Sequence, residues 1–154
     1  MSQQESTAMP SWLNRVMGGL LRSPLHGLVN RTIMLITFTG RKSGKVYTTP
    51  ISYTRQGDLV TAFTRSGWWR NLDRGAHVTL RIKNKEFQGW ATAEAKDRQA
   101  IAEGLRDSLR SVRFDARVYQ VNFDEDGQPN WEDVQTAADK VIMIRVKLNG
   151  GNDS

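Results

Sequence analysis

Residues 32–64 read TIMLITFT GRKSG KVYTTPISYTR QGD LVTAFT, and this stretch decides the fold. Thr32–Thr39, Val46–Arg55 and Leu59–Thr64 are rich in β-branched and aromatic residues, a composition that predicts β-strands. The two segments between them, Gly40–Gly44 and Gln56–Asp58, contain the glycines that tight turns favour. The stretch therefore predicts three consecutive strands joined by short turns.

The rest of the chain continues mainly in strands. The expected elements are a short helix at Trp68–Asp73, a hairpin of His77–Lys83 with Glu86–Ala93 around Asn84–Lys85, a helix at Ala95–Leu109, a strand through Tyr119, Val121 and Phe123, a turn at Asp124–Pro129, a short helix at Trp131–Ala138 and a closing strand at Val141–Val146. Short strands with few helices favour a mainly β (α+β) small barrel over a parallel α/β sheet.

The chain length of 154 residues suits one domain. We expect a disordered tail over residues 1–10, a single domain over residues 11–148 that begins with a helix at 11–30, and a second tail over 149–154. No signal peptide and no membrane-spanning run are visible, so a cytoplasmic location is the default expectation.

The formal net charge is +6, which suits nucleic acid, an anionic membrane or a phosphate-bearing small molecule as partner. Nucleic acid is disfavoured, because the aromatic residues are scattered and the acidic Asp124–Asp133 stretch would repel a phosphate backbone. The sequence contains no cysteine, which excludes disulfides and thiolate chemistry. His26 and His77 have no partners at metal-ligand spacing, so no metal site is expected.

Two stretches suggest a ligand site. Thr39–Lys45 is a glycine turn with three cations and a serine, and the backbone N–H groups of such a turn can bind an anion. A solvated hairpin turn is the equally open alternative. Trp68–Leu72 places two tryptophans side by side, and one can pack in the core while the other lines a cavity. A core anchor followed by a capping residue is the alternative, and the residues alone favour it.

The order of these motifs resembles the deazaflavin (coenzyme F-420)-dependent nitroreductase family. The matching segments are Gly40–Gly44, Thr48–Pro50, Gln56–Asp58, Trp68–Leu72, His77–Val78 and the Phe87–Ala93 strand. This resemblance implies a split β-barrel of the FMN-binding, pyridoxamine-phosphate-oxidase-like type and an oxidoreductase that binds coenzyme F-420. It further implies transfer of a hydride to a small electrophilic acceptor, either a quinone, an enone or a nitro compound.

The resemblance also implies which residues hold the cofactor. Arg41, Lys42 and Ser43 are expected to meet its phosphate and acidic tail, and strand residues are expected to lie along its ring system. The full predicted set is Arg41, Lys42, Ser43, Lys45, Tyr47, Thr48, Thr49, Pro50, Ile51, Ser52, Phe63, Thr64, Arg65, Ser66, Trp68, Trp69 and Asn71. Pro50 within a strand should mark an edge or bulge with free backbone groups.

The chain departs from the family pattern in two places. Cofactor-binding members commonly carry an arginine where this chain has Tyr47, and Lys45 is the expected substitute. The C-terminal region holds mainly Phe114 and Tyr119 where nitro-reducing members carry several tyrosines, which leaves the substrate open. Within the expected pocket, Ser52 and Tyr119 are the candidate donors to a substrate oxygen. A non-catalytic barrel, or one that binds FMN, haem or a fatty acid, is the alternative.

Residues 12–21 carry an apolar stripe flanked by Arg15 and Arg22. Such a helix can cover the barrel or contact a second subunit in a homodimer, which is the favoured interpretation. It can also lie in the membrane interface at the inner face of a membrane, and this peripheral contact is the alternative.

Overall fold

The computed structural model of the protein describes residues 33–112 and 115–150. The tail expected at 1–10, the helix expected at 11–30 and most of the tail expected at 149–154 lie outside these residues.

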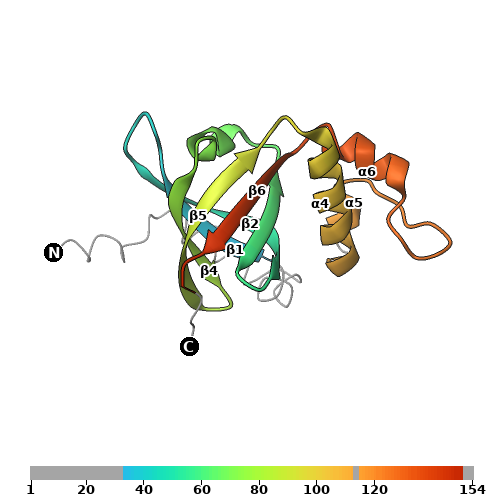
Figure 1. The fold of residues 1–154 in the computed structure, drawn as a ribbon, viewed down its shortest axis with the longest axis horizontal. Helices are drawn as coiled ribbons and strands as arrows, with labels where there is room; N and C mark the ends of the chain where they lie inside the picture. Colours follow the sequence, from blue (N-terminus) through green and yellow to red (C-terminus); the bar gives the residue numbers. More distant parts are fainter. Residues whose placement is uncertain (1–32, 113–114, 151–154) are drawn as a thin grey trace.

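Six antiparallel strands close into a barrel (Figure 1). Around the barrel the strands follow the order β1-β2-β3-β6-β5-β4, and β4 pairs with β1 to complete the circle. This arrangement confirms the prediction of a mainly β small barrel. The strands are β1 Ile33–Thr39, β2 Val46–Gln56, β3 Leu59–Thr64, β4 Ala76–Ile82, β5 Lys85–Glu94 and β6 Ile142–Leu148.

The alternation of apolar residues along the strands builds the barrel interior. In β1 the buried residues Met34, Ile36 and Phe38 alternate with partly exposed ones, as the period of two in a strand requires. They pack with residues from the other five strands and with Leu72 from a 3-10 helix, η1 Gly67–Leu72. The predicted bounds of these six strands agree with the structure to within two residues.

One hairpin turn differs from the prediction. The β4–β5 turn falls at Lys83 and Asn84 rather than at Asn84 and Lys85. Both turn residues have positive φ, 51° and 70°, the backbone form that a two-residue hairpin favours because it matches the twist of the strands.

Strand β2 divides its pairing between two neighbours. Residues from Val46 to Ser52 pair with β1, whereas Tyr53 to Gln56 pair with β3. The first part of β2 therefore has one edge that faces no other described strand, and the barrel is split there. Pro50 lies in this part, which confirms the expectation that it marks a strand edge.

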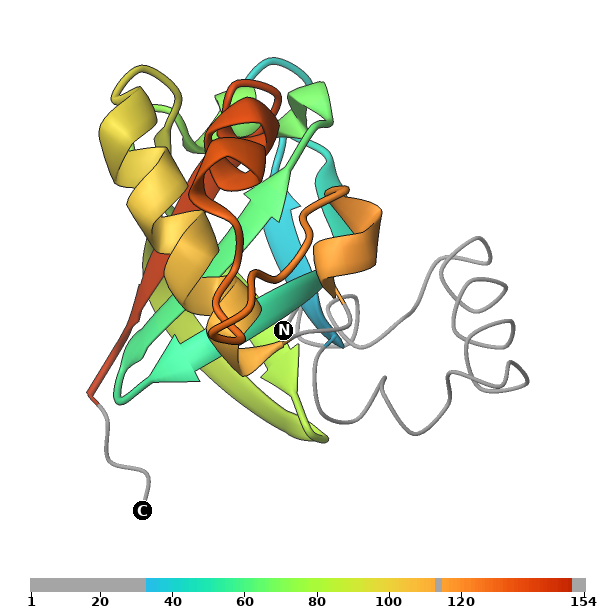
Figure 2. The ribbon, with the colours of Figure 1, turned by 90° about the vertical axis from the view of Figure 1, so that its right-hand side faces the viewer.

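A helical segment connects β5 to β6. It contains α4 Arg98–Ser111, α5 Asp115–Val118 and α6 Trp131–Ala138, and Figure 2 shows α4 and α6 in front of the barrel. Their apolar faces pack on Phe63 of β3 and Met143 of β6 in a second core. Helix α4 begins three residues later than predicted, because the Asp97 side chain accepts the Ala100 N–H and caps the helix there.

The strand predicted through Tyr119, Val121 and Phe123 is wrong. Helix α5 ends at Val118, Gln120 adopts φ 59°, and the Val121 N–H donates to the Ala116 carbonyl as in a turn. Phe123 makes a single β-bridge with Pro129. The alternating apolar side chains arise because Val121 and Phe123 pack into the core beneath the helices.

Candidate functional site

The β1–β2 turn holds its shape through its own hydrogen bonds. The Gly40 N–H donates to the Lys45 carbonyl at 2.7 Å, and the Gly44 N–H donates to the Gly40 carbonyl at 2.9 Å. Gly44 has φ 71°, a conformation that a side chain disfavours. The Ser43 Oγ accepts the Lys45 N–H at 3.1 Å and lies 3.3 Å from the Tyr47 hydroxyl. The turn therefore presents Arg41 and Lys42 from a backbone fixed by local bonds.

Asn71 connects this turn to η1. Its Oδ1 accepts the Arg41 backbone N–H at 2.9 Å, and its Nδ2 donates to the Trp68 carbonyl at 2.9 Å. The two segments are 30 residues apart in the sequence, and Figure 1 shows them side by side at the upper end of the barrel. One amide side chain thus fixes the cationic turn relative to Trp68.

Between the turn and η1 lies a pocket of about 550 Å³. Its apolar wall is a row of three stacked rings, with the Phe38 ring 5.1 Å from Trp68 and 5.8 Å from Tyr47 between centroids. Phe38 is buried and anchors the row in the barrel core, while Tyr47 is 40% exposed at its outer end. The three rings give the pocket an apolar side against which an aromatic ligand ring can pack.

The pocket is cationic. Arg41, Lys42 and Arg70 line it, and no carboxylate is among its lining residues. Within the described part of the chain, none of these three cations forms an ion pair. Unpaired cations suit a ligand with negative charge, and the side chains rather than the turn N–H groups supply the donors, because four of those N–H groups already bond within the protein.

The structure brings many of the predicted residues together. The predicted residues that line the pocket are Arg41, Lys42, Ser43, Tyr47, Thr48, Thr49, Trp68 and Asn71. Both tryptophans are partly buried and pack against the barrel core, and of the two only Trp68 also lines the pocket.

Other predicted residues lie outside the pocket lining. Lys45, Pro50, Ile51 and Ser52 belong to the same turn and strand but do not line the pocket, and neither do Thr64 and Ser66 at the end of β3. Phe63 is 7% exposed and packs beneath the helices in the second core.

Arg65 and Tyr119 lie together elsewhere. The Arg65 guanidinium lies 5.5 Å from the centroid of the Tyr119 ring, and both line a second pocket of about 80 Å³ beside α6.

Three lining residues were outside the predicted set. Phe38 and Gly40 end β1 and begin the turn, and Arg70 lies in η1. The inward position of Phe38 next to the cationic turn was a signal that could have identified it. Arg70 falls within a predicted pocket segment, but a lone arginine beside a tryptophan carries no distinctive pattern.

A metal site or a membrane-spanning helix would also bear on the function. No three side chains of the metal-ligating types gather into a possible metal site over residues 33–112 and 115–150. No helix in these same ranges has the length and hydropathy needed to cross a bilayer.

The structure resembles several solved structures. A protein of unknown function from Agrobacterium tumefaciens has a TM-score of 0.50 at 12% identity, covering 95% of this chain and 61% of that one. An F-420-H2-dependent reductase has a TM-score of 0.47 at 17% identity, covering 76% and 95%. A pyridoxamine 5'-phosphate oxidase-related, FMN-binding protein from Nostoc punctiforme has a TM-score of 0.47 at 12% identity, covering 91% and 81%.

The sequence itself identifies the family. No functionally curated protein matches the chain. The family model of the F-420H(2)-dependent quinone reductases matches residues 11–149, which is nearly the whole chain. The chain therefore belongs to the F-420H(2)-dependent quinone reductase family and is an oxidoreductase that depends on reduced coenzyme F-420.

Proposed function

We propose that reduced coenzyme F-420 binds in the pocket between the β1–β2 turn and η1, and that the chain reduces a quinone there. The observation that carries this proposal is the pairing, in one pocket, of three unpaired cations with an apolar side built from three aromatic rings. A deazaflavin with a phosphate and an acidic tail combines the same two features, a planar ring system and negative charge.

The residues of the turn bind the anionic part. The guanidinium of Arg41 and the ammonium of Lys42 supply charge-assisted hydrogen bonds, and the Ser43 hydroxyl adds a neutral donor. Because the turn is closed by its own backbone bonds, little conformational entropy is lost when a ligand binds.

Strand β2 and the aromatic wall orient the ring. The part of β2 from Val46 to Ser52 has a free edge, so its backbone groups are open to a planar ligand that lies along the strand. Phe38 and Trp68 close the apolar side and exclude water, which favours hydride transfer over side reactions. When bound, the reduced deazaflavin supplies the hydride.

The acceptor gains this hydride and one proton, so that a quinone becomes a hydroquinone. Among the described residues that line the pocket there is no carboxyl or imidazole group, and water or a hydroxyl group is the proposed source of the proton. The described lining residues that bear a hydroxyl group are Ser43, Tyr47, Thr48 and Thr49. Ser52 continues the same strand and stays a predicted donor, whereas Tyr119 lies at the smaller pocket.

The test is a titration of the purified protein with oxidised coenzyme F-420, with FMN as the control ligand. We expect saturable binding of coenzyme F-420 and weaker binding of FMN. Reduced cofactor is then mixed with a soluble benzoquinone, a cyclic enone and a nitrobenzene, and the rate of its oxidation is followed by absorbance. Tighter binding of FMN, or oxidation by the nitro compound alone, would contradict the proposal.

The predictions on assembly and location belong to this proposal as well. A homodimer, contact of the N-terminal helix with a membrane and a cytoplasmic location all remain predictions, and the helix lies outside the described residues. Sedimentation of the full chain with anionic liposomes at low salt tests the membrane contact, because electrostatic attraction is strongest under that condition. Light scattering at several concentrations tests the homodimer.

A further inference from the structure

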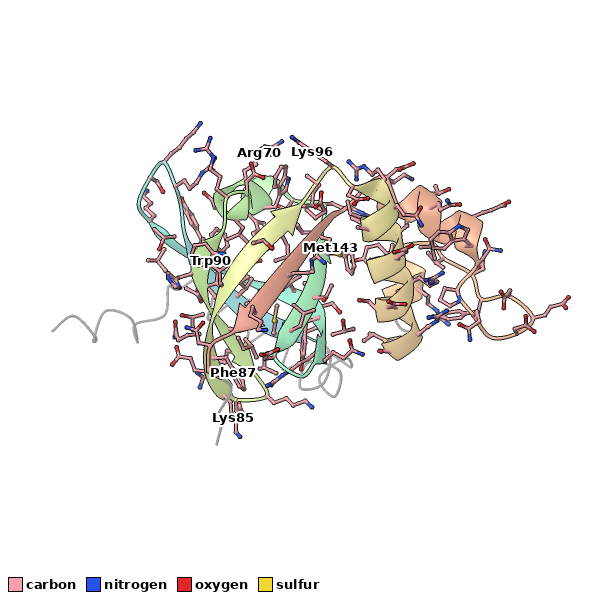
Figure 3. The ribbon with its side chains drawn as sticks, in the orientation of Figure 1. Arg70, Lys85, Phe87, Trp90, Lys96 and Met143 are labelled. Atoms are coloured by element: carbon pink, nitrogen blue, oxygen red, sulfur yellow. The ribbon has the colours of Figure 1, made fainter. Side chains whose placement is uncertain are left out.

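Arg70 reaches the pocket from a different element than the other two cations. It lies in η1, whereas Arg41 and Lys42 lie in the β1–β2 turn. Figure 3 shows Arg70 at the upper end of the barrel, the end that carries this turn. The next residue, Asn71, accepts the Arg41 N–H, so η1 meets the turn one residue away from Arg70.

The guanidinium of Arg70 is positioned without being neutralised. It lies 5.0 Å from the centroid of the Trp69 ring, a cation–π contact that favours one orientation of the side chain. Gly67 leaves the space that the guanidinium occupies, since a Cβ at that position would lie 2.8 Å from Arg70 Nη1. No carboxylate of the described residues pairs with Arg70.

Holding three like charges around one pocket is unfavourable unless a ligand of opposite charge binds there. Guanidinium groups match the geometry of phosphate and carboxylate oxygens, which they bind with two parallel hydrogen bonds. The arrangement thus suits a ligand whose anionic part is contacted from two elements rather than from the turn alone.

We propose that Arg70 is a third cationic contact to the anionic part of the cofactor, supplied by η1 to the site formed by Arg41 and Lys42. The proposal rests on the proposed function and extends it to a residue outside the predicted set. It also revises the role expected of Lys45. That residue does not line the pocket, and Tyr47 stacks on Phe38, so Arg70 supplies the additional cation.

The experiment compares two ligands that share the ring system, of which only one carries the anionic part. Coenzyme F-420 is titrated beside a deazaflavin nucleoside that lacks the phosphate and acidic tail. The variants are Arg70→Leu, Gly67→Ala and the control Arg74→Leu, which removes the same charge from an exposed residue that does not line the pocket. Gly67→Ala displaces the flexible end of Arg70 and keeps its charge.

We expect Arg70→Leu to raise the Kd for coenzyme F-420 about tenfold, because it removes one charge-assisted hydrogen-bonding partner at an exposed site. Gly67→Ala should raise this Kd by about threefold, since the guanidinium stays charged but shifts. The Kd for the nucleoside should not change in either variant, and Arg74→Leu should match the wild type with both ligands.

Two results would overturn the role of Arg70 alone. Unchanged affinity for coenzyme F-420 in Arg70→Leu excludes the contact, and an equal decrease in affinity for both ligands shows that Arg70 supports the ring rather than the anion. Failure of the wild type to bind coenzyme F-420 instead overturns the proposed function. In that case the variants are titrated with FMN and with riboflavin, which differ by one phosphate. A larger loss of affinity for FMN than for riboflavin in Arg70→Leu supports the contact with the anion, and an equal loss excludes it. If the wild type binds neither flavin, both proposals are overturned.

Discussion

The two pockets of this barrel differ in size and in charge. The pocket between the β1–β2 turn and η1 measures about 550 Å³ and has cations without a carboxylate in its lining. The pocket beside α6 measures about 80 Å³, and its lining sets Asp133 among Arg65 and Lys140. The larger pocket lies at the end of the barrel where β2 is not paired with β3, and its charged lining residues are all cations. The side covered by the helices is filled by apolar side chains, and the smaller pocket there has charges of both signs. We therefore expect substitutions in the larger pocket to change cofactor affinity, and substitutions in the core beneath the helices to change the free energy of unfolding.

The largest effect should come from Phe63→Ala. Phe63 is buried between β3 and α4 in the second core, so its removal should lower the free energy of unfolding by about 3–5 kcal/mol. Urea unfolding measures this, with Leu59→Ala as control because Leu59 lies on the same strand and is 37% exposed. The Kd of the folded variant for coenzyme F-420 should not change. A raised Kd would instead support the prediction from the sequence that Phe63 belongs to the cofactor site.

The next effect concerns the open end. Replacing both Arg41 and Lys42 with alanine should weaken binding of coenzyme F-420 by about 1.5 kcal/mol or more for each charge-assisted hydrogen bond that is removed. The control Arg81→Ala with Lys85→Ala removes the same charge from exposed residues of β4 and β5, and Figure 3 shows Lys85 at the lower end of the barrel. If affinity falls equally in both double variants, only the overall charge matters and the turn is not the binding site.

Local patterns in the sequence predicted most of the barrel. The alternation of apolar residues in Ile33–Thr39 predicts a strand, and the glycine in Gln56–Asp58 predicts a hairpin turn, from neighbouring residues alone. The glycine turn and its cations also lie within one short stretch of sequence. The pairing of β3 with β6 and the closure of β4 on β1 depend on contacts distant in sequence, so no local signal indicated them. The same reason explains the wrong strand near Val121, whose apolar alternation reflects packing under the helices. It also explains why packing of Phe63 beneath the helices had no local signal, while its place in the cofactor site stays a prediction.

A smaller effect should follow removal of the link between the turn and η1. Asn71→Ala removes two hydrogen bonds, one from the Arg41 N–H and one to the Trp68 carbonyl, and should cost about 1–2 kcal/mol of stability. Affinity for coenzyme F-420 should fall as well, because the turn is no longer fixed in position. Asn71→Asp keeps the acceptor for Arg41 and should recover part of the stability, but not the affinity, because its negative charge lies in the pocket that binds the anionic cofactor. If both variants bind as tightly as the wild type, the turn is held by its own bonds alone.

The smallest effect lies where the chain leaves the barrel for the helices. Glu94 ends β5, and its Oε2 accepts the backbone N–H groups of Asp97 and Lys96, each at 2.9 Å. These bonds favour the ionised carboxylate and lower the pKa of Glu94 below its ordinary value.

Because the folded pKa is the lower one, Glu94 stabilises the fold above its unfolded pKa, and this contribution disappears as the pH falls through the folded value. Glu94→Gln should therefore lower the free energy of unfolding at pH 7 by less than about 1 kcal/mol, since the group is partly exposed. The difference from the wild type should shrink below about pH 4, where glutamate protonates. Urea unfolding between about pH 3 and pH 7 measures both effects, with Glu86→Gln as control. A difference that stays constant across this range would mean that the carboxylate charge contributes nothing at this junction, and that barrel and helices are joined by packing alone.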